Sequence, residues 1–157
     1  MQIQSPAFSN GERIPVEYTK DGADKSVPLQ WSDAPHSTQQ FALICDDPDA
    51  PMDEPFVHWV IYNIPPDVNQ LPEDLPRREQ PGQPDGAAQG VNNFPSDNIG
   101  YGGPQPPKGH GTHHYHFKLY ALDTALNLPP KADKKSLLQA MEGHILDQAE
   151  LIGTYER

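Results

Sequence analysis

The segment FVHWVIYNI, residues 56–64, is the feature that most restricts the fold of this chain. Most of its residues are β-branched, aromatic or otherwise apolar at both alternating positions, a composition typical of a strand that is buried on both faces. Pro65 and Pro66 follow it and end it, because proline cannot donate a hydrogen bond to a strand ladder. The sequence therefore predicts a central strand of a buried sheet.

Other short apolar or alternating segments are separated by turn residues, a rhythm that predicts an antiparallel β domain. They are SPAF, RIPVEYT, PLQW and FALIC before the central strand and HYHFKLYAL after it. Asp133 is the predicted N-cap of the helical pattern KKSLLQAMEGHIL, which Gly143 is expected to divide into two short helices, and ELIGTYER is predicted to be a final strand. The result is one mainly β domain over residues 1–157 with a small C-terminal helical element.

Residues 65–107 are rich in Pro, Gly, Asn, Asp and Gln and have neither a helical nor a strand period. The chain has 19 prolines, whereas average usage of about 5 % gives roughly eight. Long loops in a compact domain are usually functional or disordered, and the proline-rich stretch from Pro48 to Pro107 also contains the aromatic, β-branched segment 56–64, which argues against disorder. We therefore predict long, stiff loops, with NIGYGGPQPPKGHG, residues 98–111, forming the rim of a site.

Charge and cysteine content exclude several classes of function. The 22 acidic residues outnumber the 11 basic ones, so nucleic acid is not an expected partner, since its binding requires a basic surface. No stretch approaches the roughly 20 apolar residues of a membrane helix, and the start of the chain has no signal-peptide pattern, so the expected location is cytoplasmic. Cys45 is the only cysteine, and we expect a buried, unreactive thiol in a reducing compartment.

Strand parity divides the histidine-rich segment GTHHYHFKLYALD, residues 111–123, into two faces. His113 and Tyr115 share one face with the apolar residues that follow, so both are predicted to point toward the core. His114 and His116 lie on the opposite face. The three closely spaced histidines are therefore not expected to form one cluster.

Two more polar features lie close to the ends of predicted strands. His58 interrupts the central strand and, considered alone, is typical of a core histidine whose hydrogen bonds are satisfied. Asp46, Asp47 and Asp49 follow FALIC in the segment CDDPDAP. Considered alone, they indicate either a proline-fixed turn or carboxylates that orient a histidine ring.

The chain resembles the phosphatidylethanolamine-binding protein family, also called the Raf kinase inhibitor protein-like family, and in particular its short bacterial and archaeal branch. The resemblance depends on three motifs in this order: DDPDAP, HWVIYNIP and GPQPPKGHGTHHY. The resemblance extends from SPAF to the end of the chain. It implies an antiparallel β-sandwich with a small pocket that holds phosphate or a phosphorylated head group. The ligand-binding residues that it implies are Asp47, Asp49, His58, His113 and Tyr115.

The chain departs from the family pattern at one position, because the GxHR element ends here in His114. A histidine with an ordinary pKa near 6.5 is mostly neutral at pH 7, whereas arginine is always charged. The replacement therefore either weakens a contact with a structural carboxylate or lowers the affinity for anions and makes it depend on pH.

The sequence thus predicts a small-anion-binding protein with no catalytic residues, no cofactor and no metal. The resemblance permits a kinase or protease partner, although nothing marks a partner surface, and a homodimer is compatible with the sequence. A metal site is the first alternative, with His110, His113, His114 and His116 as the candidate ligands. It is disfavoured because strand parity turns His113 away from His114 and His116. A weak hydrolase is the second alternative, disfavoured because no serine has a G-x-S-x-G context.

Overall fold

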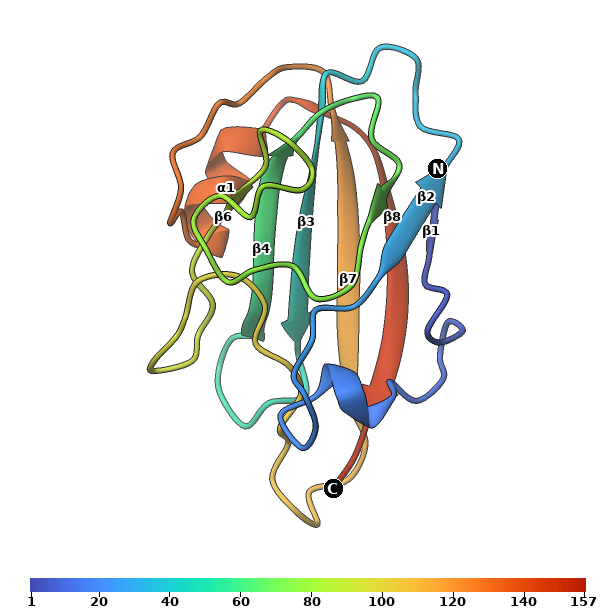
Figure 1. Cartoon of the computed structure of the whole chain (residues 1–157), viewed down its shortest axis with the longest axis vertical. Coiled ribbons are helices and arrows are strands. Elements are labelled where there is room, and N and C mark those ends of the chain that lie inside the picture. Colours follow the sequence, from blue (N-terminus) through green and yellow to red (C-terminus); the bar gives the residue numbers. More distant parts are fainter.

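Two antiparallel sheets make up most of the chain, and the computed structural model describes all 157 residues (Figure 1). The strands are β1 (Gln2–Gln4), β2 (Leu29–Ser32), β3 (Gln40–Asp47), β4 (Phe56–Ile64), β5 (Gln70–Leu71), β6 (Ala88–Gln89), β7 (His113–Leu122) and β8 (Ile145–Tyr155). The helical elements are the 3₁₀ turn η1 (Val16–Tyr18) and the helix α1 (Lys134–Met141). One sheet has the order β6-β4-β3-β7-β8 and the other β1-β2-β5, which confirms the predicted mainly β fold with a small C-terminal helix.

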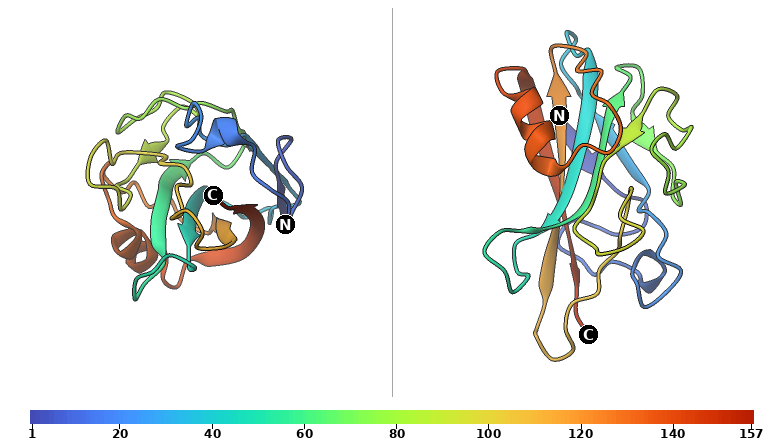
Figure 2. Two further views of the ribbon diagram at one scale, coloured as in Figure 1. Left: turned by 90° about the horizontal axis from the view of Figure 1, so that it is seen from below. Right: turned by 90° about the vertical axis from the view of Figure 1, so that its left-hand side faces the viewer.

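The five-stranded sheet is covered on both faces (Figure 2). A core of 23 buried residues fills the space toward the three-stranded sheet and the N-terminal segment, and a second core of 10 lies on the opposite face, toward α1. Trp59 and Ile61 of β4 belong to the first core, while Val60 and Tyr62 belong to the second. The prediction that residues 56–64 form an inner, doubly buried strand is therefore confirmed.

Three local predictions are wrong. SPAF and RIPVEYT are not strands: the Ser5 hydroxyl accepts a hydrogen bond from the Ala7 N–H at 3.0 Å, which closes a turn, and Pro15 leads into η1. The second short helix after Gly143 does not form, because Gly143 has a φ of +81° and returns the chain to pair with β7 as β8. The predicted helix start is confirmed, since the Asp133 side chain accepts the Ser136 N–H at 2.8 Å.

The proline-rich region contains only the short strands β5 and β6 between long loops, as its composition predicts. Gln89 fixes these loops to the core. Its side-chain oxygen accepts the indole N–H of Trp59 at 2.8 Å, and its amide nitrogen donates to the carbonyl groups of Pro76 and Arg78. No helix in the structure is long and apolar enough to cross a membrane.

Antiparallel pairing brings three strand ends together at the lower end of Figure 1. The C-terminal end of β3 lies beside the N-terminal ends of β4 and β7, with Asp47 opposite Phe56 and Asp46 opposite His116. The polar segments that the sequence places far apart therefore meet at one end of the large sheet.

Candidate functional site

A cavity of about 140 Å³ opens at this end of the sheet. Four of its wall residues are the buried polar side chains Asp47, His58, His113 and Tyr115. The rest of the wall is formed by Ala50, Pro51, Phe56, Phe94, Gln105, Pro106 and Pro107. Four of the five residues predicted to bind a ligand are thus brought together.

Strand alternation places three of these four side chains. Asp47 has the same parity as Phe41, Leu43 and Cys45 on β3, which belong to the first core. His113 and Tyr115 likewise share a face with Phe117 and Leu119 on β7. The predicted inward orientation of His113 and Tyr115 is confirmed, and each is only 1 % exposed.

His58 reaches the cavity because of a β-bulge. The register between β3 and β4 shifts at this point, so that Cys45 pairs with Trp59 and Asp46 pairs with Val57, leaving His58 as the extra residue. Strict alternation would place His58 on the face of Val60, toward α1. The bulge instead turns its ring toward Tyr115, at a centroid distance of 5.1 Å, which is how bulges re-aim side chains beside functional sites.

A chain of three polar groups runs along one wall of the cavity. Nδ1 of His113 donates to the Asp47 carboxylate at 2.6 Å, and Nε2 of His113 lies 2.7 Å from Nδ1 of His110. The other Asp47 oxygen accepts the Asp49 N–H at 2.8 Å. Because a carboxylate only accepts, Nδ1 of His113 carries a proton, and one further proton is shared between His113 Nε2 and His110.

His58 lies on the opposite wall and is held by the backbone of Gly102. Its Nδ1 donates to the Gly102 carbonyl oxygen at 2.6 Å, and the Gly102 N–H donates to the His58 carbonyl at 2.8 Å. Burial lowers the pKa of His58 to about 4, although the hydrogen bond to Gly102 and the charge of Asp47 oppose this shift. The ring is therefore neutral near pH 7.

Two polar atoms on the wall have no hydrogen-bond partner within the protein. They are the Tyr115 hydroxyl and Nε2 of His58. Unlike the indole nitrogen of Trp31 and one Asp46 oxygen, which are fully buried and make no hydrogen bond, these two atoms remain reachable from outside. Burial raises the pKa of Tyr115 well above its ordinary value, so the hydroxyl keeps its proton. Both atoms are therefore available to a ligand.

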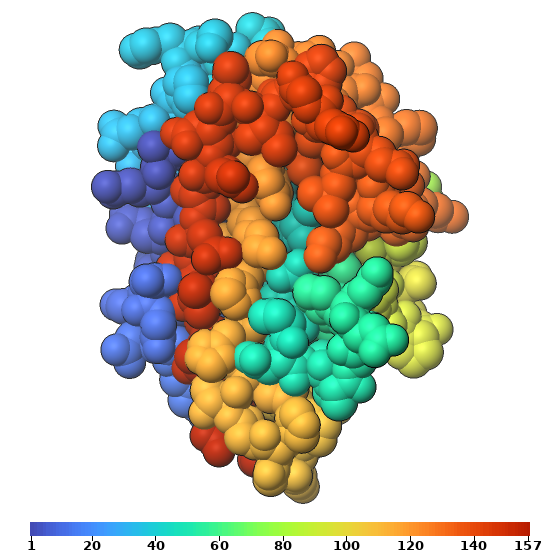
Figure 3. Space-filling view, turned by 180° about the vertical axis from the view of Figure 1, so that it is seen from behind, coloured from blue at the N-terminus to red at the C-terminus, as the bar shows by residue number.

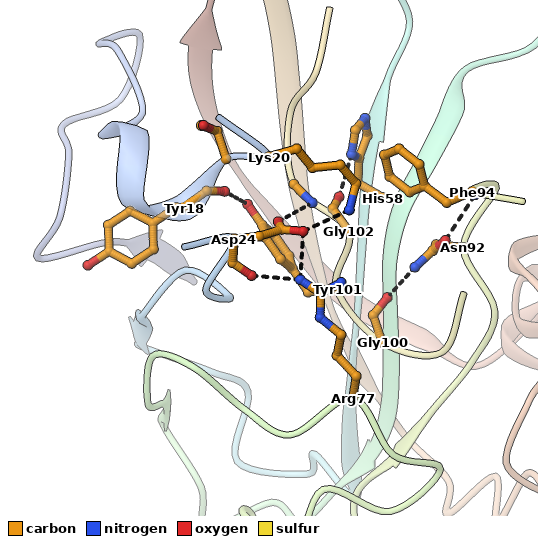
Figure 4. Close-up of polar contacts among 12 residues, drawn as sticks. Tyr18, Lys20, Asp24, His58, Arg77, Asn92, Phe94, Gly100, Tyr101 and Gly102 are labelled. Carbon is orange, nitrogen blue, oxygen red and sulfur yellow. Dashed lines mark hydrogen bonds and ion pairs between the residues drawn. The ribbon is translucent and has the colours of Figure 1, made fainter. Parts of the chain in front are cut away.

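The glycine-rich segment behind His58 is clamped from several sides (Figure 4). One oxygen of Asp24 accepts the Gly103 N–H at 2.8 Å, while the other lies 2.7 Å from both Lys20 Nζ and an Arg77 nitrogen. The Tyr101 hydroxyl donates to the Tyr18 carbonyl at 2.7 Å. This network fixes the segment that holds His58, and Gln105, Pro106 and Pro107 of the predicted rim, residues 98–111, line the cavity.

We expect a Gly103→Ala substitution to lower the free energy of unfolding by about 2 kcal/mol, within the range for overpacking a fitted site. An added Cβ would lie 2.5 Å from both the Tyr18 carbonyl oxygen and an Asp24 oxygen, and the backbone oxygen cannot move aside. Urea denaturation would measure the change. Gly109→Ala is the comparison variant: its Cβ would meet no atom within 4 Å, but its φ of +77° strains any L residue, so backbone strain alone is expected to cost about 1 kcal/mol. An equal loss in both variants would contradict the steric explanation.

Asp49 does not join the cavity wall. One of its oxygens accepts both the backbone N–H of His114 at 2.8 Å and Nδ1 of His114 at 2.7 Å. Partial burial alone would raise the pKa of Asp49, but the hydrogen bonds and charge of His114 outweigh it and hold the pKa below its ordinary value. The structure thus places His114, the departure from the family pattern, against a carboxylate and away from the cavity.

The three aspartates at the end of β3 and in the turn after it point in three directions. Asp46 faces the α1 side, where its oxygens lie 2.7 Å from Lys134 Nζ and 3.5 Å from Lys118 Nζ. Asp47 faces the cavity and Asp49 faces His114. CDDPDAP is therefore not one cluster of carboxylates.

The four candidate metal-ligating histidines are also separated. His110 and His113 contact each other, whereas His114 pairs with Asp49 and His116 with Glu150 at 3.2 Å. No group of three or more His, Cys, Asp or Glu side chains in the structure is arranged to hold a metal ion.

A larger groove of about 920 Å³ lies on the other face of the sheet, bordered by α1 and the loop of residues 48–55 (Figure 3). Met52, Leu138 and Ile145 line it, and each is exposed. The lysines and acidic residues at its edge also belong to the outer surface. A binding site for a polar ligand is better explained by the smaller cavity, because enclosed polar groups converge only there.

Comparisons with known proteins identify the family of this chain. The family profile described as Phosphatidylethanolamine-binding protein matches residues 4–156. The chain belongs to this family.

Relatives in archaea and bacteria cover almost the whole chain. A UPF0098 protein of Methanothermobacter thermautotrophicus is 50 % identical over 157 residues, which is 100 % of this chain and 99 % of the relative. The crystal structure of a phosphatidylethanolamine-binding protein homologue from Chlamydia trachomatis is 40 % identical, with a TM-score of 0.87 and coverage of 99 % and 97 %. Escherichia coli YbcL, described as a member of the mammalian PEBP family, is 34 % identical, with a TM-score of 0.91 and coverage of 99 % and 98 %. The resemblance to the short bacterial and archaeal branch is thus confirmed.

Several residues of the site are not recognised from the sequence. His110 is named there only as a candidate metal ligand, although its spacing of three from His113 places it close enough to touch that ring. Phe94, whose ring centroid lies 5.5 Å from that of His58, is the one aromatic residue in the polar loop after β6 up to residue 98, a clue that could have been used. For Asp24 and Arg77 the sequence holds no comparable clue.

Proposed function

We propose that the cavity binds a small tetrahedral oxyanion, either phosphate or the phosphate of a head group, without changing it chemically. The main support is that four buried polar side chains converge on one small cavity while the Tyr115 hydroxyl and Nε2 of His58 remain unpaired. Buried polar groups normally have partners, so two unpaired ones facing the same space favour a bound ligand.

The size of the cavity favours a head group over a whole lipid. A water molecule occupies about 30 Å³ of liquid, so a cavity of about 140 Å³ holds the equivalent of a few waters. Pockets for drug-sized ligands begin at about 300 Å³. Acyl chains would therefore remain outside the cavity.

Two hydrogen-bond donors on β7 can bind the anion. The Tyr115 hydroxyl can donate directly, and His113 can donate from Nε2 when it carries both ring protons while Asp47 holds its Nδ1. No lysine or arginine lines the cavity, and the net charge of the chain is −11. We therefore expect weak to moderate affinity, with dissociation constants of about 10 µM to 1 mM.

Binding without catalysis is the simpler proposal. Cys45 is enclosed in the core, and burial together with Asp46 and Asp47 raises the pKa of its thiol well above the ordinary value. A nucleophilic thiolate is thus disfavoured. The pKa of Tyr115 is likewise raised by burial, which disfavours a phenolate.

Isothermal titration with inorganic phosphate and with phosphorylethanolamine tests the proposal. We expect one site per chain for each ligand and mutual competition, because both place a phosphate group in the same cavity. Absence of binding by both ligands at millimolar concentration would contradict the proposed function. Binding without competition would show that the phosphate group does not occupy one shared site.

His110 gives a second expectation for the same site. Nδ1 of His110 lies in hydrogen-bond contact with Nε2 of His113, the atom that is proposed to donate to the anion. A ligand must therefore break the contact between these two rings in order to bind. A His110→Ala variant is expected to bind phosphate about 2- to 10-fold more tightly, the equivalent of one neutral hydrogen bond. Titration of the variant beside the wild type measures this, and weaker binding would show that His110 helps to hold the ligand.

A further inference from the structure

The proton arrangement of His58 restricts what this cavity can hold. The Gly102 carbonyl oxygen can only accept a hydrogen bond, so the proton of the neutral ring is on Nδ1, which lies 2.6 Å from it. Nε2 then carries a lone pair and no proton. This second nitrogen points away from Gly102 (Figure 4).

The charged and titratable groups around His58 leave the ring neutral. Asp47 approaches from β3, Lys20 and Asp24 from the segment after η1, and His113 and Tyr115 from β7. Burial is the largest effect and lowers the pKa of His58, the two acidic residues raise it, and Lys20 lowers it further. With Nδ1 already engaged, Nε2 therefore acts as an acceptor near neutral pH.

We propose that the cavity selects oxyanions that carry a proton, namely the P–OH form of phosphate or of a phosphomonoester, whose hydroxyl donates to Nε2 of His58. This inference rests on the proposed function and adds the proton state of the ligand to it. A fully ionised anion would place an oxygen lone pair against the lone pair of Nε2. The Tyr115 hydroxyl cannot relieve both groups, since it has one proton to donate.

Phosphate and sulfate separate this requirement from shape. Both are tetrahedral oxyanions of similar size, but near pH 7 inorganic phosphate always carries at least one proton, as H₂PO₄⁻ or HPO₄²⁻, and sulfate carries none. A binding site that leaves a buried acceptor unpaired loses affinity, so we expect phosphate to bind about 10- to 100-fold more tightly than sulfate. Arsenate, which likewise keeps at least one proton near pH 7, is the positive control and should bind like phosphate.

Two substitutions test whether His58 causes the discrimination. In His58→Asn, the amide nitrogen takes the place of Nδ1 and can still donate to Gly102, while the acceptor at Nε2 is lost. In His58→Gln, the amide lies near the position of Nε2 and can present an N–H group to the anion. We expect the ratio of sulfate to phosphate dissociation constants to approach one in both variants, with sulfate binding gained in His58→Gln.

The experiment is isothermal titration of wild type and both variants with phosphate, arsenate and sulfate at pH 7, after thermal melting has shown that each variant folds. Equal binding of phosphate and sulfate by the wild type would overturn this inference and leave the proposed function standing. Binding of no anion would overturn both. A wild-type preference that persists unchanged in both variants would overturn the assignment to His58.

Discussion

Replacing His113 by asparagine is expected to weaken phosphate binding about 100-fold or more, the combined effect of losing a charge-assisted hydrogen bond and leaving Asp47 uncompensated beside an anion. The asparagine amide can take the place of Nδ1 and preserve the 2.6 Å contact with Asp47, so the fold is retained. The substitution removes the donor at Nε2 and the positive charge that a doubly protonated ring would place beside Asp47. Isothermal titration with phosphate measures the loss.

The neighbouring histidine provides the matched control. His114 lies on the opposite face of β7 with its side chain 49 % exposed, and it contacts Asp49 instead of the cavity. His114→Asn is therefore expected to change the affinity for phosphate less than about twofold, as for a surface substitution away from the site. If His113→Asn bound phosphate as tightly as wild type, the assignment of His113 as a donor would be wrong.

The opposite side-chain directions of His113 and His114 are the feature of the site that the sequence predicts best. Alternation along a strand fixes which side chains share a face, and the apolar residues of β7 identify the face that points to the core. The orientations of His113, Tyr115, His114 and His116 follow directly from that pattern, and burial in the structure agrees with it.

Strand alternation does not predict that the His58 side chain faces the cavity. Its face depends on the bulge between β3 and β4, where one β4 residue has no partner opposite. Nothing in FVHWVIYNI marks the position of the extra residue, because apolar residues occupy both faces around it. Only the resemblance to the family placed His58 in the pocket.

Contacts between distant segments account for most of what the sequence does not reveal. Asp24 has a φ of +57° and joins Lys20, Arg77 and the Gly103 backbone, which are up to 79 residues away along the chain. Such a network depends on how long loops pack, and loop packing has no sequence period to predict it. The same holds for Asp49, whose choice of His114 over the cavity follows from the turn after β3.

The elements of the fold also separate into those that local sequence patterns predict and those that they do not. The long strands β3, β4 and β7 and the N-cap of α1 follow from local patterns, because each pattern has a defined partner or cap. SPAF and RIPVEYT have strand-like composition but turn or become irregular at Pro6 and Pro15, and Phe8 and Ile14 bury their side chains without lying in a strand. Burial alone, without ladder partners, does not make a strand.

The two cavity histidines differ because their Nδ1 protons are given to different acceptors. His113 donates its Nδ1 proton to a carboxylate and has its Nε2 within reach of a second, shared proton, whereas His58 donates its Nδ1 proton to a neutral carbonyl inside the core. One ring can therefore donate to an anion while the other accepts from it. This asymmetry explains how a pocket without lysine or arginine can hold both an anion oxygen and a hydroxyl.

The neutral, buried His58 is also expected to make the fold sensitive to acid. Its pKa is lowered from an ordinary value of 6.5 to about 4, so between these pH values the unfolded chain takes up a proton that the folded chain does not. The free energy of unfolding is therefore undiminished above about pH 6.5 and falls by about 3 kcal/mol on the way to pH 4. That is a large part of a typical stability of about 5–15 kcal/mol.

Urea denaturation of wild type and His58→Gln between pH 7 and pH 4 isolates this contribution. The variant is expected to lose about 3 kcal/mol less over the interval than wild type, whatever its stability at pH 7, because glutamine does not titrate. Asp49 and Asp133 do not account for the difference, since a carboxyl group with a pKa lowered from 3.8 loses its stabilising effect only below that value. His114→Gln serves as the exposed control and should follow wild type. Parallel curves for wild type and His58→Gln would show that His58 is protonated in the folded chain as readily as in the unfolded one.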